Sequence, residues 1–481
     1  MELDQSWSLA YEVCQKVQNM GGRAYVVGGA ARDLWRFREY GGRLELKDVD
    51  IEVFGLGMPV LKEALETRWR VDEVGKSFGV LKLHGEPVDI SIPRREVKTG
   101  QGHKDFEILP DPGMTLHEAA ARRDFTINAI SWDPLTDKWD DPYNGREHMA
   151  CGILQPVSDK FSEDPLRVLR GMQFVARFDL DATDACLEAC RGLSQEHLPR
   201  ERIWEEWKKL LLKGRHIGKA LRFLRDTGWL ERFYPELHLL IGSQQTPAWH
   251  PEGDVFEHTC LVADAFAQGE FADDEERLTL GLAALCHDLG KPLTAVYGPT
   301  KNNLVPHWTN HNHENRVEHA VSFLARLTNE PKLVEEVLRL VKHHMKPYAF
   351  HRSGAELSTI RRLAMEVKLD LLCKLVWFDQ SGRGPTMPPD PEVIQWLKAR
   401  AEQANVLYSK PKPLVLGRDL ITSFGLPPGK ALGAVLKDLM ERQLSGEFST
   451  KEEGLEVARR IITSKQNETE AASQQSGVHP H

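Results

Sequence analysis

The stretch from Gly28 to Phe54 places the strongest limit on how this chain can fold. It follows the apolar run 24–27, begins with two glycines and ends shortly after Asp48-Val49-Asp50. The pattern predicts a strand, a tight glycine turn, a helix and a second strand. Glycines let a backbone approach a phosphate closely, and the amide groups that open the helix point toward the same place. The stretch therefore predicts a phosphate-binding turn beside a strand with two carboxylates.

The carboxylates of the second strand predict a cation site. Asp48 and Asp50 share one face because side chains alternate along a strand. Paired carboxylates together with a phosphate are the usual ligands of Mg²⁺, which can help a hydroxyl group attack a phosphate. Beside Gly28 and Gly29, Arg32 would add a charge-assisted bond to that phosphate. The alternative is a plain hairpin turn followed by a solvated strand edge.

Taken in this order, the motifs Val-Gly-Gly-x-x-Arg-Asp and Asp-x-Asp resemble the class II tRNA nucleotidyltransferases and bacterial poly(A) polymerases. The alternating run 88–92 predicts a further strand. The resemblance implies that Asp89 on this strand is a third catalytic carboxylate beside Asp48 and Asp50.

The run 122–130 is similar to the RRDxTxNA motif of the same family. We expect it to continue a helix that starts near His117. The resemblance implies that Arg123 contacts the nucleotide triphosphate or sugar. It also implies that Asp124 and Asn128 stabilise the site, whereas a plain surface ion pair would contribute little.

The run Phe161–Arg170 predicts a helix capped by Ser162, with Pro165 in its first turn. Asp164, Arg167 and Arg170 would lie on one face of it. An aspartate and an arginine can together satisfy the base edge of cytosine or adenine, whereas guanine and uracil present donors and acceptors in the wrong order. The resemblance implies this base-selecting role, with Arg170 assisting; the alternative is a salt bridge within the helix.

Two segments between these motifs affect the substrate assignment. Residues 93–114 are polar and glycine-bearing, so we expect a mobile loop. In the resembled family a flexible loop here helps the enzyme switch from C to A, which favours full CCA addition. Residues 36–46, between the glycine turn and Asp48, are longer than in the best-known subgroup and leave the substrate range open.

A second set of metal-ligating residues follows Trp249. Imidazole and carboxylate groups from separate helices can converge on one divalent metal. The order His…His-Asp…Asp resembles the HD phosphohydrolases, which implies hydrolysis of phosphomonoesters or 2′,3′-cyclic phosphodiesters with a transition metal (Ni²⁺, Mn²⁺ or Co²⁺). The implied ligands are His258, His287, Asp288 and Asp379. The implied auxiliary residues are His313, His343 and His344.

The bulk composition sets broader limits. The chain has 481 residues, a net charge of −9 and seven cysteines without a CxxC pair. Neither a zinc ribbon nor a disulfide framework is indicated, and reduced thiols favour a cytoplasmic location. No apolar run is long enough to span a membrane. The acidic balance argues mildly against nucleic acid, but a basic face along 208–225 is either an RNA contact or a solvated helix face.

We expect an α+β protein with a mixed-sheet nucleotidyltransferase head followed by all-helical neck, HD and tail domains. The expected boundaries are a head (1–150), a neck with the base-selecting residues (151–245), an HD domain (246–400), a helical tail module (411–464) and a disordered end (465–481). The connections between the HD-type ligands are expected to be helical.

The favoured function is addition of CCA to the tRNA 3′ end from CTP and ATP, with Mg²⁺ at the head. One alternative is a poly(A) polymerase. Another is an HD phosphohydrolase whose head only binds RNA, and a purely structural RNA-binding protein is the weakest. The sequence leaves open whether the chain is a monomer or a homodimer.

Overall fold

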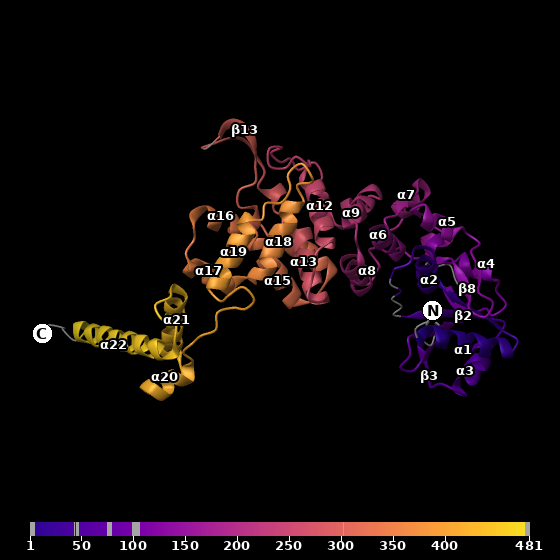
Figure 1. Ribbon diagram of the computed structural model, residues 1–481, viewed down its shortest axis with the longest axis horizontal. Coiled ribbons are helices and arrows are strands. Elements are labelled where there is room, and N and C mark those ends of the chain that lie inside the picture. Colours follow the sequence, from indigo (N-terminus) through magenta and orange to yellow (C-terminus); the bar gives the residue numbers. More distant parts are fainter. Residues whose placement is uncertain are drawn as a thin grey trace. The chain divides into compact units, whose positions relative to one another are not determined.

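The computed structural model describes residues 5–42, 44, 48–74, 79–98, 106–301 and 303–476. The chain forms two units, Met1–Pro235 and Glu236–His481. A mixed sheet lies in the first unit, and most of the remaining chain is helical (Figure 1). The expected α+β class, with a mixed-sheet head before helical regions, is therefore confirmed.

A seven-stranded sheet forms the centre of the first unit, in the order β3-β4-β5-β2-β1-β8-β9. Strands β2 and β5 are parallel, and the other neighbouring pairs are antiparallel. The strands are β1 (Arg23–Val27), β2 (Val49–Phe54), β3 (Val71–Val74), β4 (Val80–Leu83), β5 (Val88–Ser91), β8 (Ser131–Asp133) and β9 (Lys138–Asp140).

The two faces of this sheet differ because the sequence alternates. Val49, Ile51 and Val53 are fully buried in a core shared with α1 (Gln5–Asn19), α2 (Gly28–Tyr40) and α3 (Met58–Glu66). Burying each such side chain contributes about 1.5–3 kcal/mol, which fixes the register of the strand. Asp50 and Glu52 consequently point to the opposite face, which is left open for a site.

Helices complete the first unit, as expected for the neck. Helix α6 packs against both α8 and α9. The helices after the sheet are α4 (Leu116–Ala120), α5 (Gly145–Ala150), α6 (Leu166–Phe178), α7 (Asp184–Arg191), α8 (Arg200–Lys213), α9 (Ile217–Asp226), α10 (Trp229–Phe233) and α11 (Pro235–His238, which crosses into the second unit), with 3₁₀ turns η1 (Thr126–Asn128) and η2 (Asp159–Glu163) and the short pair β10 (Ile153–Leu154) and β11 (Asp181–Ala182).

Three local expectations for the first unit are wrong. Within the expected loop 93–114, β6 (Arg94–Lys98) and β7 (Phe106–Pro110) pair as an antiparallel ribbon, and residues 99–105 lie outside the described part. The helix near His117 ends at Ala120, so the arginine motif lies in turns and a 3₁₀ turn. Asp164 lies before α6, whose N-cap is Pro165 and not the expected Ser162, and its Oδ1 accepts the amide hydrogen of Leu166.

The second unit is a helical bundle in which α13 contacts α12, α15 and α18 (Figure 1). Its helices before the tail are α12 (Val255–Ala267), α13 (Asp274–Cys286), α14 (Glu318–Leu327), α15 (Pro331–His343), α16 (Lys346–Ser353), α17 (Leu357–Glu366), α18 (Leu369–Ser381) and α19 (Glu392–Gln403), with 3₁₀ turns η3 (Lys291–Leu293) and η4 (His313–Asn315). The connection after Lys291 is not helical as expected, but an antiparallel hairpin of β12 (Val296–Thr300) and β13 (Asn303–Thr309).

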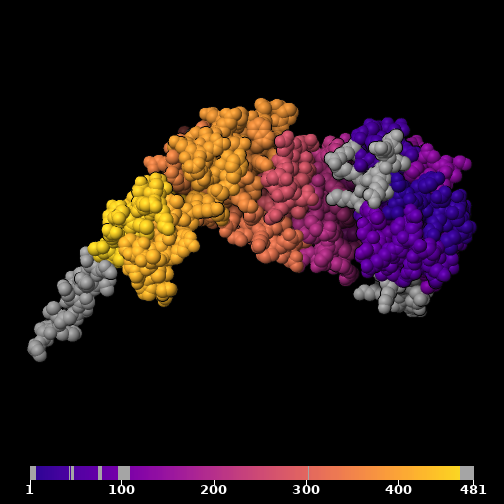
Figure 2. Space-filling view, turned by 60° about the horizontal axis from the view of Figure 1, so that its bottom comes forward, coloured from indigo at the N-terminus to yellow at the C-terminus, as the bar shows by residue number. Residues whose placement is uncertain are grey.

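The last helices form a lobe with its own hydrophobic core, drawn in yellow in Figure 2. They are α20 (Gly417–Phe424), α21 (Lys430–Ser445) and α22 (Lys451–Ser476). A disordered end was expected from residue 465, whereas α22 is a helix that extends to Ser476; residues 477–481 lie outside the described part. Among the described helices, none combines the length and apolar character that a membrane crossing requires.

Candidate functional site

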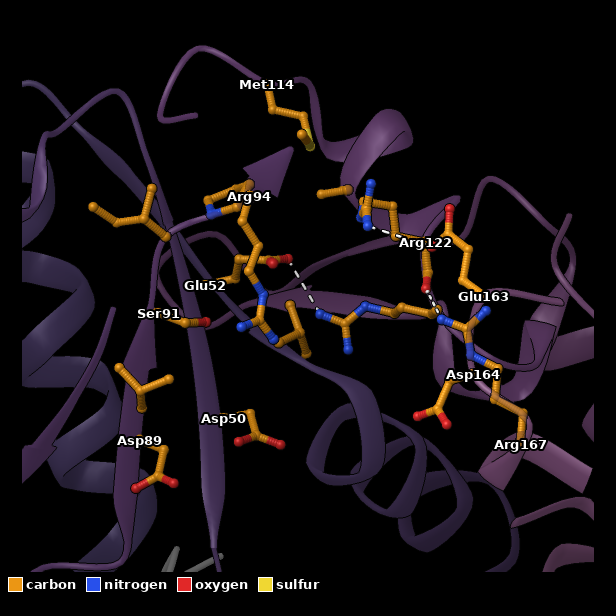
Figure 3. Close-up of a pocket in the computed structure, with 16 residues that line it drawn as sticks. Asp50, Glu52, Asp89, Ser91, Arg94, Met114, Arg122, Glu163, Asp164 and Arg167 are labelled. Carbon is orange, nitrogen blue, oxygen red and sulfur yellow. Dashed lines mark hydrogen bonds and ion pairs between the residues drawn. The ribbon is translucent and has the colours of Figure 1, made fainter. Parts of the chain in front are cut away.

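A cavity of about 500 Å³ opens on the polar face of the sheet in the first unit. Asp50 and Asp89 line one side of it, and Asp164 and Arg167 line the opposite side (Figure 3). Arg123 also lines this cavity. The structure thus brings together five of the residues that the sequence analysis selected, from positions more than 100 apart along the chain.

The two carboxylates lie side by side on neighbouring strands. Asp50 on β2 pairs with Asp89 on the parallel strand β5. Burial by surrounding protein atoms raises the pKa of Asp50; Arg123 opposes this effect, and the carboxylates of Asp89 and Asp48 add to it. By surface area Asp50 is exposed, because it lines the cavity. Repelling carboxylates at a cavity wall are a donor set that suits a hard divalent cation.

Two observations limit how these carboxylates can bind a metal. Lys82 binds Asp89, with Nζ 2.8 Å from Oδ2. Asp48 is exposed and does not line the cavity. Among the described residues, sets of three donor atoms within 4.8 Å of one another lie in the second unit. In the first unit the carboxylates can contribute to a metal site that substrate phosphates complete.

The glycine turn is built as expected, and it adjoins Arg123. Gly28 has φ +67°, a conformation that favours glycine, and a Cβ atom there would lie 2.9 Å from Arg123 Nη1. Arg123 Nη2 donates to Glu52 Oε2 at 3.2 Å. Glu52 was not selected from the sequence, although its place two residues after Asp50 puts it on the same strand face.

None of Gly28, Gly29 and Arg32 is among the described residues that line this cavity. Arg32 is buried, donates to both carboxylate oxygens of Asp33 and bonds Asn128 Oδ1 at 2.5 Å. Its guanidinium also lies over the ring of Phe178, 4.6 Å from the centroid. Gly29 lies beside Arg32 rather than at the cavity wall. Arg32 therefore joins α2 to the arginine motif and to α6.

Asp164 and Arg167, which were expected to select the base, are held by other protein groups instead of by each other. Arg167 donates to the carbonyl groups of Lys160 and Arg122, at 2.6 and 2.7 Å. Asp164 Oδ2 accepts from Arg202 at 2.8 Å. Both side chains are consequently fixed at the cavity wall before any ligand binds.

Arg170 does not line the cavity. Its Nε donates to Asp124 Oδ2 at 2.6 Å, and Asp124 Oδ1 accepts from Asn128 at 2.9 Å. This buried network explains the sequence of the arginine motif: Asp124 joins α6 to η1 and so fixes Arg123 beside it. Sequence reasoning missed Arg94, which lines the cavity from β6 (Figure 3), because that segment was expected to be a loop.

Six buried metal-capable side chains converge in the second unit. One set of donor atoms belongs to His258, His287 and Asp379, and a second set belongs to Asp288, His313 and His344. They come from α12, the end of α13, η4, the end of α15 and α18. All four expected ligands and two of the three expected auxiliary histidines are thus brought together.

Each histidine ring is oriented by a bond to its outer nitrogen. Nδ1 of His287, His313 and His344 lies 2.7–2.8 Å from the carbonyl oxygens of Ala284, Asn310 and Val341, respectively. In His258, Nδ1 lies 2.7 Å from Glu252 Oε1. The four Nε2 atoms are therefore directed inward, which is the arrangement of metal-ligating histidines.

Asp288 lies between the two donor sets. Its Oδ2 is 3.1 Å from His287 Nε2, and its Oδ1 is 3.1 Å from His313 Nε2. Lys291 Nζ lies 2.6 Å from Asp288 Oδ2 and donates to Gln245. Although it lies close to Asp288, the buried Nε2 of His287 makes no hydrogen bond of good geometry with any described residue. These donors fit one or two divalent transition-metal ions with Asp288 between them.

The protonation states of His344 and Asp379 suit metal ligands, whereas His258 would have to release a proton when a metal binds. Burial, followed by the neighbouring imidazoles, lowers the pKa of His344 to about 3, so this ring is neutral. Burial would raise the pKa of Asp379, but the hydrogen bond and charge of His258 hold it well below its usual range. Burial would lower the pKa of His258, but the flanking carboxylates raise it to about 9.

Two further residues change the predicted set. Glu252 accepts from His258 and lies 2.9 Å from His250 Nδ1, and these three form another metal-capable group that sequence reasoning missed. His343 is buried but, among the described residues, joins none of the donor sets. Adjacent helical residues point about 100° apart, so His344 faces the site and His343 does not. Its expected auxiliary role is not supported.

Three protein-family models match successive parts of the chain. The model described as "Poly A polymerase head domain" matches residues 24–155. That described as "Probable RNA and SrmB- binding site of polymerase A" matches 181–240, and that described as "HD domain" matches 255–374.

Solved structures of low sequence identity share the fold. The Bacillus stearothermophilus CCA-adding enzyme, solved in complex with CTP, has a TM-score of 0.63 and 21% identity, covering 97% of this chain and 100% of its own. The Thermotoga maritima CCA-adding enzyme, solved with tRNA, has a TM-score of 0.58 and 17% identity, with 96% of each chain covered.

Relatives in sequence are more similar. The multifunctional CCA protein of Laribacter hongkongensis is 37% identical over 276 residues, which cover 56% of this chain and 64% of the relative, slightly less than two thirds of its length. That of Methylobacillus flagellatus is 36% identical over 349 residues, which cover 72% of this chain and 78% of the relative. This chain therefore belongs to the multifunctional CCA protein family.

Proposed function

We propose that this chain adds C, C and A to the 3′ end of tRNA from CTP and ATP, in the cavity of the first unit. The observation that carries the proposal is that one cavity is lined by Asp50 and Asp89 on one side and by Asp164 and Arg167 on the other. Carboxylates suit the transfer chemistry, and a fixed aspartate–arginine set suits selection of a base. The relatives' name and the CTP and tRNA in the neighbours' titles agree with this substrate set.

The reaction forms one P–O bond and breaks another. The tRNA 3′-hydroxyl oxygen attacks the α-phosphate and releases its proton to solvent, the bond between the α-phosphate and its bridging oxygen breaks, and pyrophosphate leaves. Asp48, Asp50 and Asp89 would hold Mg²⁺, which supplies charge neutralisation at the reacting phosphates when bound. The amide groups at Gly28 and Gly29 and the guanidinium of Arg123 would position the triphosphate or sugar.

Base selection follows from the rigidity of the cavity wall. Arg167 is held by two carbonyl groups and Asp164 by Arg202 and the Leu166 amide, so neither has to be ordered when a nucleotide binds. Their remaining donors and acceptors match the edges of cytosine and adenine but not those of guanine and uracil. Arg170 acts as a positioning residue through Asp124, and Arg32 does so through Asn128.

We propose a second, metal-dependent phosphohydrolase activity for the second unit. His258, His287, Asp288 and Asp379 would hold a transition metal (Ni²⁺, Mn²⁺ or Co²⁺), and His313 and His344 would complete a second position. The metal would supply a Lewis acid for hydrolysis of a phosphomonoester or a 2′,3′-cyclic phosphodiester. The buried cation of Lys291 would bind the phosphate, with Asp288 and Gln245 orienting it.

Extension of a tRNA transcript that lacks its 3′ CCA tests the main proposal. In Mg²⁺, CTP alone should add two nucleotides, CTP with ATP should add three, and extension should then stop. Long tails with ATP alone would instead identify a poly(A) polymerase. No extension under any condition would favour the alternative of an HD phosphohydrolase with an RNA-binding head. A cytoplasmic location follows from the substrate and is part of the same proposal.

A further inference from the structure

A second cavity in the first unit lies toward the opposite end of α2 from the glycine turn. It has a volume of about 570 Å³ and shares none of its lining residues with the first cavity. Three segments build it: the end of α2 with the residues after it, the end of α6, and the chain at the end of α8. The first of these segments includes the described residues (36–42 and 44) of the lengthened stretch 36–46, for which the nucleotidyl-transfer chemistry has no use.

Cationic side chains dominate the described wall of this cavity. They are Arg36, Arg177, Lys213 and Arg215. The acidic side chain among the described lining residues is Asp33, and both of its oxygens are bonded by Arg32, at 2.8 and 3.0 Å. The wall therefore carries an excess of positive charge, although the whole chain is acidic.

An aromatic ring helps to hold two of these arginines, Arg36 and Arg177, in place. Arg36 and Arg177 lie over Phe178, with the guanidinium carbons 4.6 and 4.7 Å from its centroid. Arg177 also donates to the neutral side chain of Gln173 at 3.1 Å. Burial is the main cause that lowers the pKa of Arg177 to about 10, and the nearby charges of Arg32 and Arg36 add to it.

An exposed aromatic residue stands among the lining residues. Tyr40, 59% exposed, lines the cavity and contacts Trp35 edge to face, with ring centroids 5.8 Å apart. Guanidinium groups bind phosphates through paired hydrogen bonds, and exposed aromatic rings stack on bases or sugars. Such a combination is typical of sites that hold a nucleotide unit without reading its sequence.

We propose that this cavity is a second phosphate-binding site that holds a backbone phosphate of the RNA substrate between Arg36 and Arg177, with Tyr40 beside the adjoining nucleoside. The RNA identity of the ligand rests on the proposed tRNA substrate. The phosphate chemistry would be shared by a free nucleoside triphosphate, so the experiment separates these two sources.

The test compares Arg36→Gln, Arg177→Gln and Tyr40→Ala with Arg38→Gln. Arg38 lies on the same helix but pairs with Asp137 at 2.6 Å and does not line the cavity, so its variant is the matched control. The readout is the Kd of a tRNA transcript lacking CCA, measured by fluorescence anisotropy between 50 and 200 mM salt. Calorimetry with ATP alone counts the nucleotides bound per chain.

We expect Arg36→Gln to raise the Kd for tRNA about tenfold and to reduce the slope of log K against log salt by about one, because one phosphate contact is lost. Arg177→Gln and Tyr40→Ala should also weaken binding, and Arg38→Gln should match the wild type. Loss of a second ATP equivalent with tRNA binding unchanged would assign the phosphate to a free nucleotide and overturn the RNA assignment. Unchanged binding of both ligands would overturn the site itself.

Failure of the proposed function would look different. Wild-type protein would then not extend tRNA at all, whatever the variants at the second cavity do. If the function is right, the Arg36→Gln variant should still add CMP at saturating tRNA, with the loss confined to the tRNA concentration needed. The Arg36 side chain is only partly buried, so Arg36→Gln should leave the protein folded, and weaker binding by this variant would not be explained by misfolding.

Discussion

Glu252 Oε1 lies 2.7 Å from Nδ1 of His258, whose Nε2 in turn lies 3.1 Å from Asp379. The imidazole is thus oriented by one carboxylate so that its other nitrogen faces the proposed metal site. Outer partners of this kind change metal affinity by about 10–100-fold when removed. Glu252→Ala should therefore weaken Ni²⁺ binding by that factor, measured by calorimetry on the metal-free protein.

Two variants make that prediction specific. Glu252→Gln keeps an oxygen acceptor for His258 and should retain most of the affinity. Glu318→Gln removes a carboxylate of the second unit that pairs with Arg316 at the surface, and it should have no effect. Wild-type affinity in Glu252→Ala would contradict the orienting role.

The two glycines of the turn should respond differently to an added methyl group. At Gly28, alanine must adopt φ +67° and its Cβ would lie 2.9 Å from Arg123 Nη1, so Arg123 has to move. At Gly29 the Cβ would meet Arg32 Nη2 at an ordinary 3.5 Å. We expect Gly28→Ala to lower kcat/KM for CTP at least about tenfold and to destabilise the unit by about 1 kcal/mol.

Gly29→Ala serves as the matched comparison and should keep activity within a few-fold of the wild type. Steady-state CMP incorporation and thermal unfolding measure the two quantities. Equal losses in both variants would mean that the backbone of the turn, and not the position of Arg123, limits activity.

Asp124 should make the first unit sensitive to acid. Burial would raise its pKa, but Arg170 and the hydrogen bond from Asn128 outweigh burial and hold it below the usual value. Its contribution is therefore fully present above the unfolded pKa, about 3.9, and is lost as the pH falls through the lower folded pKa. Asp124→Asn should cost about 2 kcal/mol at pH 7, because a charged hydrogen bond is lost.

Denaturant unfolding of the first unit between pH 7 and pH 2.5 checks this sign. The difference in the free energy of unfolding between the wild type and Asp124→Asn should become smaller as the pH falls below 4. Glu188→Gln, at an exposed pair with Arg191, should leave the curve unchanged. A difference that stays constant with pH would mean that the lost stability comes from packing rather than from the charge of Asp124.

The residues of the first cavity could be predicted from the sequence where the alternation of side chains along a strand decides their position. Alternation in β2 placed Asp50 opposite the buried side chains of Val49 and Ile51, and a parallel neighbour brought Asp89 beside it. Long-range partners were beyond reach: no pattern indicates that Arg170 binds Asp124 or that Arg202 binds Asp164. These pairs depend on how α6 and α8 pack against the sheet.

The hairpin after Lys291 illustrates a signal that was present but misread. Residues 296–309 carry β-branched and aromatic residues, such as Val296 and Trp308, on both sides of the polar run Lys-Asn-Asn, which is consistent with a hairpin. The roles of Glu252 and His343 could not be predicted in the same way. One depends on a loop folding back onto α12, and the other depends on where α15 ends.

The two proposed activities should be separable. Asp379→Asn keeps the shape of a ligand in the second unit but removes its charge, and the loss of metal-dependent hydrolysis should exceed the 10–100-fold typical of outer partners. Hydrolysis of 2′,3′-cyclic AMP with added Ni²⁺ measures this, and dialysis against a chelator should abolish the same activity in the wild type. CMP incorporation in Mg²⁺ should stay at the wild-type rate, and a parallel loss would mean that the sites are coupled.

Single-turnover incorporation of CMP by Asp50→Asn tests the central claim most directly. The substitution keeps the shape of the side chain and removes its negative charge. Without that charge, the proposed Mg²⁺ site should lose several kcal/mol of transition-state stabilisation. The account predicts a rate lower by about 10³ with the Kd for tRNA unchanged. Incorporation by Asp50→Asn at the wild-type rate would contradict the assignment of nucleotide addition to this cavity.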